Sequence, residues 1–299
     1  MMELEQVKTY VIENADLRVE IMNLGATVTS LQFQGREVVL HYENPSDYLT
    51  HDGYLNAIVG RYANRIGRAT ATIHDQVYQM VPNDGKNQLH GGPNSFDRKL
   101  WTATLVEKDQ VRFELFSPDG ENGYPGNLTA GVTYRISNNQ LQIDFDGVSD
   151  KDTLYAPTTH MYFNLGSASV LDASMQICAD AYLKVDNENI PVSIEAVDSV
   201  FDFRTMRRIK ENYDHCFILS GEPACILEDQ GLRMTIRTDY PGLQVYTGFM
   251  LNGQLHPNQG IALEPEVYPD SPNHPEYPSA ILQKNKLYKK FIEYSFKMV

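Results

Sequence analysis

The sequence feature that most constrains the fold is a two-residue alternation of apolar and polar side chains, which recurs along the chain. It is clearest in Val111–Phe116 and in Leu141–Phe145. Because successive side chains of a β-strand point to opposite faces, this pattern predicts strands with one buried face. Turn-forming clusters such as Ser117–Gly120 and Asn138–Asn139 lie between such runs. We therefore expect short antiparallel strands joined by tight turns.

Helical periodicity is weak throughout the chain. The best short candidates for helices are Val192–Ala196 and the segment around Met206–Glu211. The chain contains no internal repeat and no Gly/Ser-rich linker. The Pro-rich segment Pro265–Pro278 is interpreted as an ordered loop lying on the sheet, because strand-like residues flank it. We predict an all-β antiparallel sandwich or barrel that forms one domain over residues 1–299.

The charge balance limits the classes of partner. The 39 acidic and 25 basic side chains give a formal net charge of −14, whereas nucleic acids and anionic membranes require a basic face. No apolar stretch approaches the ~18 residues of a membrane-spanning helix, and the opening residues MMELEQVKTYVIEN show no secretory signal pattern. Three cysteines without paired spacing (Cys178, Cys216 and Cys225) fit reduced thiols. We expect a cytoplasmic protein that binds neither nucleic acid nor membrane.

Motifs for the common cofactors are absent from the sequence. There is no Gly-x-Gly-x-x-Gly or Gly-x-x-x-x-Gly-Lys-Ser/Thr segment to hold phosphates, and no His-Glu-x-x-His segment or EF-hand loop to bind a metal. A Gly-x-Ser-x-Gly segment, which is typical of serine hydrolases, is also missing. We therefore expect neither a cofactor nor a metal.

Several polar side chains that can carry chemistry lie in strand-like or glycine-rich segments. Each has an ordinary structural explanation. Arg65 can pair with an acid, and His90 and His160 can be hydrogen-bonded structural residues. Asp214 can cap a turn, and Glu264 can be a solvated strand end. Taken together, two histidines, a carboxylate and further hydrogen-bonding side chains suit acid–base chemistry on a sugar or another polyol.

These segments also occur in the order found in one enzyme family. The chain resembles the aldose 1-epimerases (galactose mutarotases) over most of its length. The matching segments are Asn23–Leu31, Gly60–Ile66, His90–Gly92 with Phe96–Asp97 and Trp101, Gly123–Gly126, Thr159–Leu165, Phe201–Arg204, Asp214–Phe217, Gln244–Gly248, Leu263–Glu264 and Tyr268–Pro275. The resemblance implies a large antiparallel β-sandwich of the galactose mutarotase-like (supersandwich) type. It also implies an isomerase that interconverts the α and β anomers of a free aldose, galactose or glucose, without a cofactor.

The resemblance further implies roles for individual residues. Glu264 matches the general base that takes the proton from the anomeric hydroxyl, and His160 matches the general acid that protonates the ring oxygen. His90 matches a second histidine near the ring oxygen. The positions that bind the sugar hydroxyls, with a tyrosine beside them, correspond to Asn64, Arg65, Asp214, Gln244 and Tyr162. The implied partner is a small monosaccharide, and the protein is expected to be a monomer or homodimer.

The sequence departs from the family pattern close to these residues. Thr159 and Met161 flank His160 where Asn and a small polar residue are common, Phe249 replaces a frequent Asn, and Glu266 replaces a usual Gln. These changes spare the acid–base pair but leave the preferred sugar open. Two alternatives therefore stand beside the main prediction. One is an epimerase of a disaccharide or a hexose 6-phosphate, and the other is a non-catalytic sugar-binding or sensing protein of the same fold.

Overall fold

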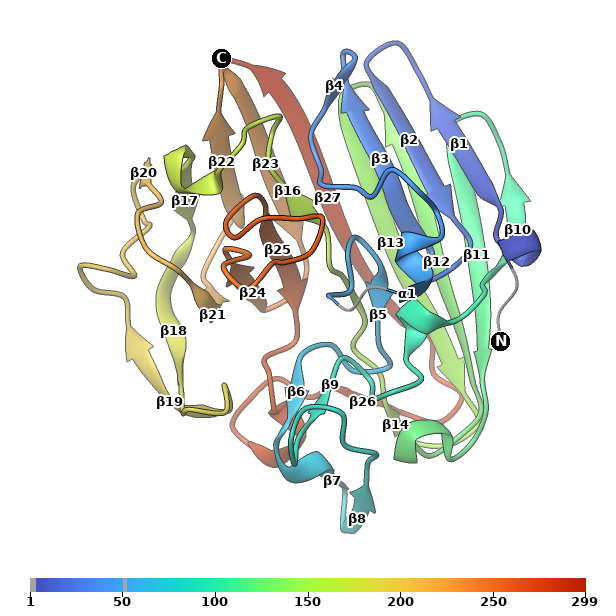
Figure 1. The fold of residues 1–299 in the computed structure, drawn as a ribbon. Helices are drawn as coiled ribbons and strands as arrows, with labels where there is room; N and C mark the ends of the chain where they lie inside the picture. Colours follow the sequence, from blue (N-terminus) through green and yellow to red (C-terminus); the bar gives the residue numbers. More distant parts are fainter. Residues whose placement is uncertain (1–3, 51–52) are drawn as a thin grey trace.

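The computed structural model describes residues 4–50 and 53–299, so the first three residues of the segment searched for a secretory signal lie outside the described range. Strands make up 48% and helices 7% of the chain, which confirms the all-β prediction. Within the described residues, nine strands form one large antiparallel sheet (Figure 1). Its spatial order is β10 (Thr102–Val106), β11 (Gln110–Ser117), β12 (Leu128–Ser137), β13 (Gln140–Ser149), β27 (Tyr288–Met298), β23 (Leu232–Thr238), β22 (Cys225–Asp229), β17 (Ser174–Ile177) and β20 (Arg207–Arg208).

A second and a third sheet face the large sheet (Figure 1). Six strands of the described residues form the second sheet, in the order β16 (Tyr162–Phe163), β25 (Ile261–Glu266), β24 (Gly242–Tyr246), β21 (Asp214–Leu219), β18 (Ala179–Val185) and β19 (Pro191–Ala196). The third sheet, counted over the same residues, has the order β1 (Thr9–Glu13), β2 (Leu17–Met22), β3 (Thr27–Phe33) and β4 (Arg36–Glu37).

Short strand pairs and single helical turns complete the fold. The strand pairs are β5 (Ile58–Val59) with β15 (Thr158–Thr159), β6 (Arg65–Ile66) with β9 (Gln88–Leu89), β7 (Thr70–Ile73) with β8 (Gln76–Gln79), and β14 (Thr153–Leu154) with β26 (Ile281–Leu282). The helical turns are α1 (Asp47–Thr50) and 3₁₀ turns at Leu4–Gln6, Gly67–Ala69, Phe96–Arg98, Glu121–Gly123, Val170–Asp172 and Ser271–Asn273.

Both helix candidates from the sequence are wrong. Val192–Ala196 belongs to strand β19, which pairs with β18, and the segment around Met206–Glu211 contains strand β20, which pairs with β17. Windows of five or six residues are too short to distinguish the helical period from the strand period. Here the backbone hydrogen bonds to neighbouring strands replace those that a helix would make within itself.

The core lies between the large sheet and the two sheets that face it. Phe33 of β3 stacks on Phe296 of β27, with ring centroids 5.8 Å apart. Phe163 of β16 packs against Tyr294 of the same strand β27 at 5.0 Å. Strand β27 therefore contacts both facing sheets, and the predicted antiparallel sandwich is confirmed.

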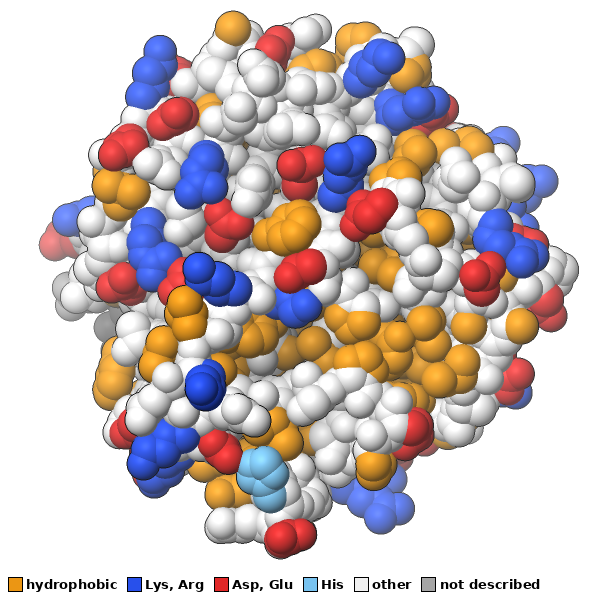
Figure 2. Space-filling view, turned by 180° about the vertical axis from the view of Figure 1, so that it is seen from behind, with side chains coloured by type: hydrophobic (Ala, Val, Ile, Leu, Met, Phe, Trp, Pro, Cys, Tyr) orange, Lys and Arg blue, Asp and Glu red, His pale blue; other side chains and the backbone are white. Residues whose placement is uncertain are grey.

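The predicted alternation is confirmed in strand β11. Val111, Phe113 and Leu115 are buried, whereas the intervening Arg112 is partly exposed and forms an ion pair with Asp146 of β13. Figure 2 shows the molecule from behind, where side chains of both charges are interspersed with hydrophobic ones. One face of the large sheet thus fills the core, and the other face carries mixed charges.

The Pro-rich segment Pro265–Pro278 begins inside strand β25 and then leaves the sheet. Oδ1 of Asp270 accepts a 2.8 Å hydrogen bond from the backbone N–H of Gly67. The hydroxyl of Tyr62 donates a 2.5 Å hydrogen bond to the carbonyl of Tyr268. The segment therefore joins the end of β25 to the chain around strand β6.

Candidate active site

Four of the predicted site residues lie on one face of the second sheet, as the strand register requires. Gln244 of β24 pairs directly with Glu264 of β25, and directly paired residues project to the same face. Asp214 of β21 lies opposite the residue two places after Gln244. Tyr162 of β16 lies opposite the residue two places before Glu264. Because every second residue of a strand shares a face, all four side chains point to the same side.

The facing wall of the site comes from the β6–β9 pair. Arg65 pairs with Leu89 in this ladder, which brings Asn64 and His90 side by side. Both residues have left-handed backbone conformations, with φ of 61° and 51°, a region in which Asn and His are enriched. The backbone N–H of His90 donates a 3.0 Å hydrogen bond to the carbonyl of Asn64. His160 lies just before β16 and completes the wall.

The two walls border a cavity of about 280 Å³. It is concave and contains several converging polar groups, which is typical of small-molecule sites. The structure brings all eight predicted site residues to its lining: Asn64, Arg65, His90, His160, Tyr162, Asp214, Gln244 and Glu264.

Other lining residues were missed by sequence reasoning. They are mostly aromatic or apolar and form much of the rest of the lining: Tyr42, Gly53, Tyr54, Leu89, Tyr246, Met250, Leu251, Asn252 and Leu255. Strand register could have found Tyr246, because it lies two residues after Gln244 and shares its face. The loop residues carry no comparable pattern, since side chains of these types are also ordinary core residues.

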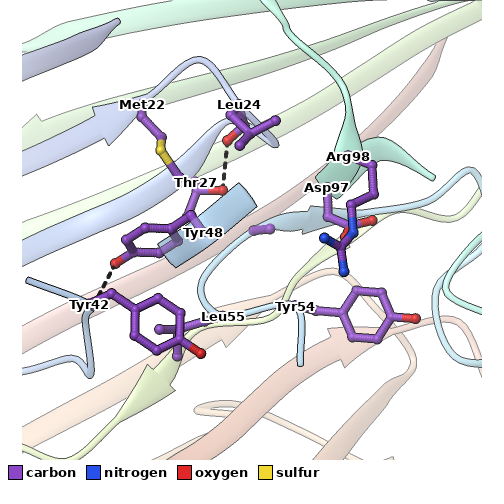
Figure 3. Close-up of a pocket in the computed structure, with 10 residues that line it drawn as sticks. Met22, Leu24, Thr27, Tyr42, Tyr48, Tyr54, Leu55, Asp97 and Arg98 are labelled. Carbon is purple, nitrogen blue, oxygen red and sulfur yellow. Dashed lines mark hydrogen bonds and ion pairs between the residues drawn. The ribbon is translucent and has the colours of Figure 1, made fainter. Parts of the chain in front are cut away.

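A smaller cavity of about 20 Å³ shares Tyr42 and Tyr54 with the main one (Figure 3). The rings of Tyr42 and Tyr48 meet edge to face at 4.9 Å, and the Tyr48 hydroxyl accepts a 3.1 Å hydrogen bond from the backbone N–H of Tyr42. The ring of Tyr54 lies 4.6 Å from that of His90. These tyrosines therefore support the edge of the main cavity.

Glu264 and His160 form the buried centre of the site. Nε2 of His160 lies 3.5 Å from Oε1 of Glu264, and the two side chains are only 6% and 2% exposed. Burial lowers the pKa of His160 to about 4. Burial, followed by repulsion from Glu266 and Asp214, raises the pKa of Glu264 well above its ordinary value of 4.5. Within the described chain, Oε2 of Glu264 and Nδ1 of His160 have no hydrogen-bond partner, which leaves polar atoms available to a ligand.

The ring of His90 has a defined hydrogen-bonding state. Its Nδ1 accepts a 3.1 Å hydrogen bond from the backbone N–H of Asn64, so the neutral ring carries its proton on Nε2. Burial lowers the pKa of His90 well below 6.5, and His160 and Arg65 act in the same direction. The ring centroids of the two histidines are 5.2 Å apart. His90 is therefore a neutral N–H donor beside the Glu264–His160 pair.

Arg65 and Asp214 are both held by neighbouring side chains. Nε of Arg65 donates a 2.8 Å hydrogen bond to Oδ2 of Asp84, so this arginine pairs with an acid and also lines the cavity. Oδ1 of Asp214 accepts a 2.6 Å hydrogen bond from Gln244, and its Oδ2 accepts one of 3.2 Å from Asn189. Such support orders polar groups before a ligand binds and so lowers the entropy cost of binding.

His90, His160 and Glu264 also have the side-chain types of a metal site. One ligand atom each from His90, His160 and Glu264 lie within 4.8 Å of one another, and two histidines with a carboxylate suit zinc. However, Nδ1 of His90 accepts the Asn64 N–H, so its Nε2 carries the proton and offers no lone pair. The group fits proton transfer better than metal coordination.

Solved structures of galactose mutarotase-like proteins share the antiparallel sandwich of this chain. The family model for aldose 1-epimerase matches residues 8–295. The chain therefore belongs to the aldose 1-epimerase family, whose members are isomerases, as the motifs predicted.

Individual relatives agree with this assignment. The chain is 38% identical to an aldose 1-epimerase of Haemophilus influenzae, over 94% of this chain and 93% of that protein. It is 34% identical to a galactose mutarotase of Bos taurus, over 94% and 92% of the two chains. Among solved structures, an aldose epimerase homologue from C. elegans superposes with a TM-score of 0.94 at 27% identity, covering 98% and 99%. A galactose 1-epimerase from Lactobacillus acidophilus superposes with a TM-score of 0.90 at 30% identity, covering 98% of each chain.

Proposed function

We propose that this protein interconverts the α and β anomers of a free, unphosphorylated aldose, with Glu264 as general base and His160 as general acid. The observation that carries the proposal is the 3.5 Å approach of the two side chains within a buried polar cavity. Opening a cyclic hemiacetal requires removal of a proton from O1 and delivery of another to O5. A carboxylate and an imidazolium beside one cavity supply both transfers.

The Glu264–His160 pair can complete this cycle without exchanging protons with solvent. It holds one titratable proton, either as ionised Glu264 with protonated His160 or with both groups neutral. Ring opening converts the first form into the second, because Glu264 gains the O1 proton and His160 gives its proton to O5. Rotation about C1–C2 then turns the other face of the carbonyl towards O5. The same two proton transfers in reverse close the ring as the opposite anomer. Burial shifts both pKa values towards the neutral form, which is the form that ring opening produces.

The surrounding side chains are assigned to binding and orientation. Neutral His90 offers an N–H donor near the ring oxygen, and the ring of Tyr162 lies 4.9 Å from that of His160. The side chains assigned to the sugar hydroxyls are Asn64, Arg65, Asp214 and Gln244. Since each well-placed proton carrier contributes roughly 10²–10⁴-fold to the rate, two of them suffice for a reaction that already proceeds in water.

The charges in the cavity favour a neutral sugar over a hexose 6-phosphate. Among the described lining residues, Arg65 is the only lysine or arginine, and it is already paired with Asp84. Two carboxyl groups, those of Asp214 and Glu264, line the same cavity. A phosphate would need several basic groups together, so its binding is expected to be weak here.

Polarimetry of freshly dissolved α-galactose and α-glucose tests the proposal. We expect wild-type protein to accelerate the decay of optical rotation, and Glu264→Gln and His160→Ala to lower kcat by at least about 100-fold each. Glu211→Gln, at an exposed position, is the matched control and should keep full activity. Wild-type protein that binds these sugars in calorimetry without accelerating the decay would instead support the non-catalytic sensing protein.

Three broader predictions accompany this function. We infer a single domain over residues 1–299, a cytoplasmic location, and a monomer or homodimer. No helix in the described part of the chain is long and apolar enough to cross a membrane. Limited proteolysis and size-exclusion chromatography with light scattering test the domain and assembly predictions.

A further inference from the structure

Glu266 is a buried carboxyl group that the proposed reaction does not use. It lies two residues after Glu264 on strand β25, opposite Gly242 of β24, and therefore on the same face of the sheet. The residue is 0% exposed, and it is not among the described residues that line the cavity. Glu266 thus lies behind the cavity wall, so direct contact with a substrate does not account for it.

The hydrogen-bond partner of Glu266 is Asn64. Nδ2 of Asn64 donates a 2.9 Å hydrogen bond to Oε1 of Glu266, and Oδ1 of Asn64 accepts one of 2.8 Å from the backbone N–H of Arg65. A backbone N–H can only donate, so the amide oxygen must face Arg65 and the amide nitrogen must face Glu266. Glu266 therefore has to act as an acceptor.

Asn64 in turn holds His90 through its backbone. The N–H of Asn64 donates to Nδ1 of His90 at 3.1 Å, and the N–H of His90 donates to the carbonyl of Asn64 at 3.0 Å. Asn64 is thus held at its side chain by Glu266 and at its backbone by His90. A displacement of Asn64 would change both the orientation and the proton position of the His90 ring.

We propose that Glu266 is a positioning residue whose carboxyl oxygen holds Asn64 and thereby keeps His90 in its Nε2–H form at the sugar site. This inference rests on the proposed function, in which His90 donates a hydrogen bond to the substrate. Because a misplacement of about 1 Å can cost about 100-fold in rate, loss of this support should appear mainly in kcat.

The surroundings of Glu266 favour its neutral form. Burial is the main cause that raises its pKa well above 4.5, and Asp214 adds to this shift, whereas the Asn64 hydrogen bond and Arg65 oppose it. The ionisable groups around it come from several elements: Tyr62 and Arg65 beside Asn64, Asp214 and Cys216 on β21, and Glu264 on its own strand. A charge on either Glu264 or Glu266 disfavours ionisation of the other.

Two substitutions at Glu266 separate its possible roles. Glu266→Gln keeps an oxygen acceptor without charge, so kcat and KM should stay within about threefold of wild type. Glu266→Met keeps a similar size but has no oxygen, so kcat should fall about 10- to 100-fold with a smaller change in KM. As a control, Thr158→Val removes a buried 2.6 Å hydrogen bond to the carbonyl of Pro265, which lies on the same strand as Glu266. It should lower stability and leave kcat unchanged.

The ring nitrogens of His90 give a readout that does not depend on activity. In protein labelled with ¹⁵N-histidine, with His90 assigned from the His90→Gln variant, wild type and Glu266→Gln should show the Nε2–H form. Glu266→Met should show a mixture of ring forms. Unchanged His90 signals together with unchanged kcat in Glu266→Met would overturn the positioning role. If kcat fell as far in Glu266→Gln as in Glu266→Met, an uncharged oxygen acceptor at this position would not be sufficient, and that part of the proposal would be overturned.

Thermal denaturation against pH tests the neutral form even if Glu266→Met does not fold. Native Glu266 retains its proton at pH values where the unfolded chain has lost it, so wild type loses stability relative to Glu266→Gln as pH rises above 4.5. The difference in Tm should therefore grow with pH, and a constant difference would overturn the neutral form. If wild-type protein does not accelerate mutarotation, the proposed function fails, while the nitrogen signals and Tm still decide the role of Glu266.

Discussion

Nε2 of His160 lies 3.5 Å from Oε1 of Glu264, and both side chains are almost completely buried. In water a histidine is more basic than a glutamate, so such a pair would be ionised. Burial acts against that preference, because it lowers the pKa of His160 to about 4 and raises the pKa of Glu264 well above 4.5. Burial therefore favours the proton on Glu264, whereas the separate groups in water favour it on His160, and a reversible proton transfer uses both forms.

The pH dependence of kcat/KM should be bell-shaped. Below about pH 4 a second proton enters the Glu264–His160 pair, because burial lowers the pKa of His160 to about 4. At high pH the pair loses its single proton, and this limb lies well above 4.5 because burial raises the pKa of Glu264. Polarimetry with the uncatalysed rate subtracted at each pH measures both limbs. If kcat/KM stays constant over both limbs of the pH profile, the Glu264–His160 pair does not share a single catalytic proton.

Arg65→Ala should chiefly weaken substrate binding. Hydrogen bonds to a charged group contribute about 1.5–3 kcal/mol, so we expect KM to rise by at least about tenfold while kcat changes less. Arg68→Ala, three residues further along and exposed, is the control and should leave KM unchanged. An unchanged KM in Arg65→Ala would show that this arginine only supports Asp84.

Gly91→Ala should destabilise the protein and lower its activity. Gly91 has φ of +90°, and an added Cβ would lie 1.9 Å from the carbonyl oxygen of Gly60. Overpacking of this kind costs about 1–3 kcal/mol, and the backbone shift that it forces would displace the adjacent His90. Gly85→Ala is the matched control, since Gly85 also has positive φ but no atom within 4 Å of its added Cβ. Equal Tm values for the two variants would refute the role of the Gly60 contact.

Treatment with EDTA should leave the activity unchanged. The Asn64 N–H occupies Nδ1 of His90, which leaves the proton on Nε2 and removes a ligand from the candidate metal group. Polarimetry before and after dialysis against the chelator measures the effect, with elemental analysis of the protein as the control. Activity that EDTA abolishes and zinc restores would contradict the proton-transfer assignment.

Much of the fold could be predicted because it follows from local alternation. Val111, Phe113 and Leu115 face the core as their spacing predicts. The helix candidate Val192–Ala196 failed because its hydrogen-bond partners lie in another strand, β18, which a short window does not contain.

Part of the candidate site could also be predicted from the sequence. The chemical types of His160 and Glu264 and their motifs pointed to acid–base work. Tyr42 and Tyr54 were missed, because an aromatic residue at a cavity edge has the same local pattern as one in a core.

The sequence by itself determined which residues alternate into strands and which side chains are able to transfer protons or bind hydroxyls. Only the tertiary structure decided which of them meet. Asn64 and Glu266 are 202 residues apart in the chain and hydrogen-bond directly, because strand pairing and loop packing set distances that local sequence does not contain. Burial and neighbouring groups then set the pKa values of Glu264 and His160 and the proton position on His90, since protonation depends on the surroundings of a group and not on its identity alone.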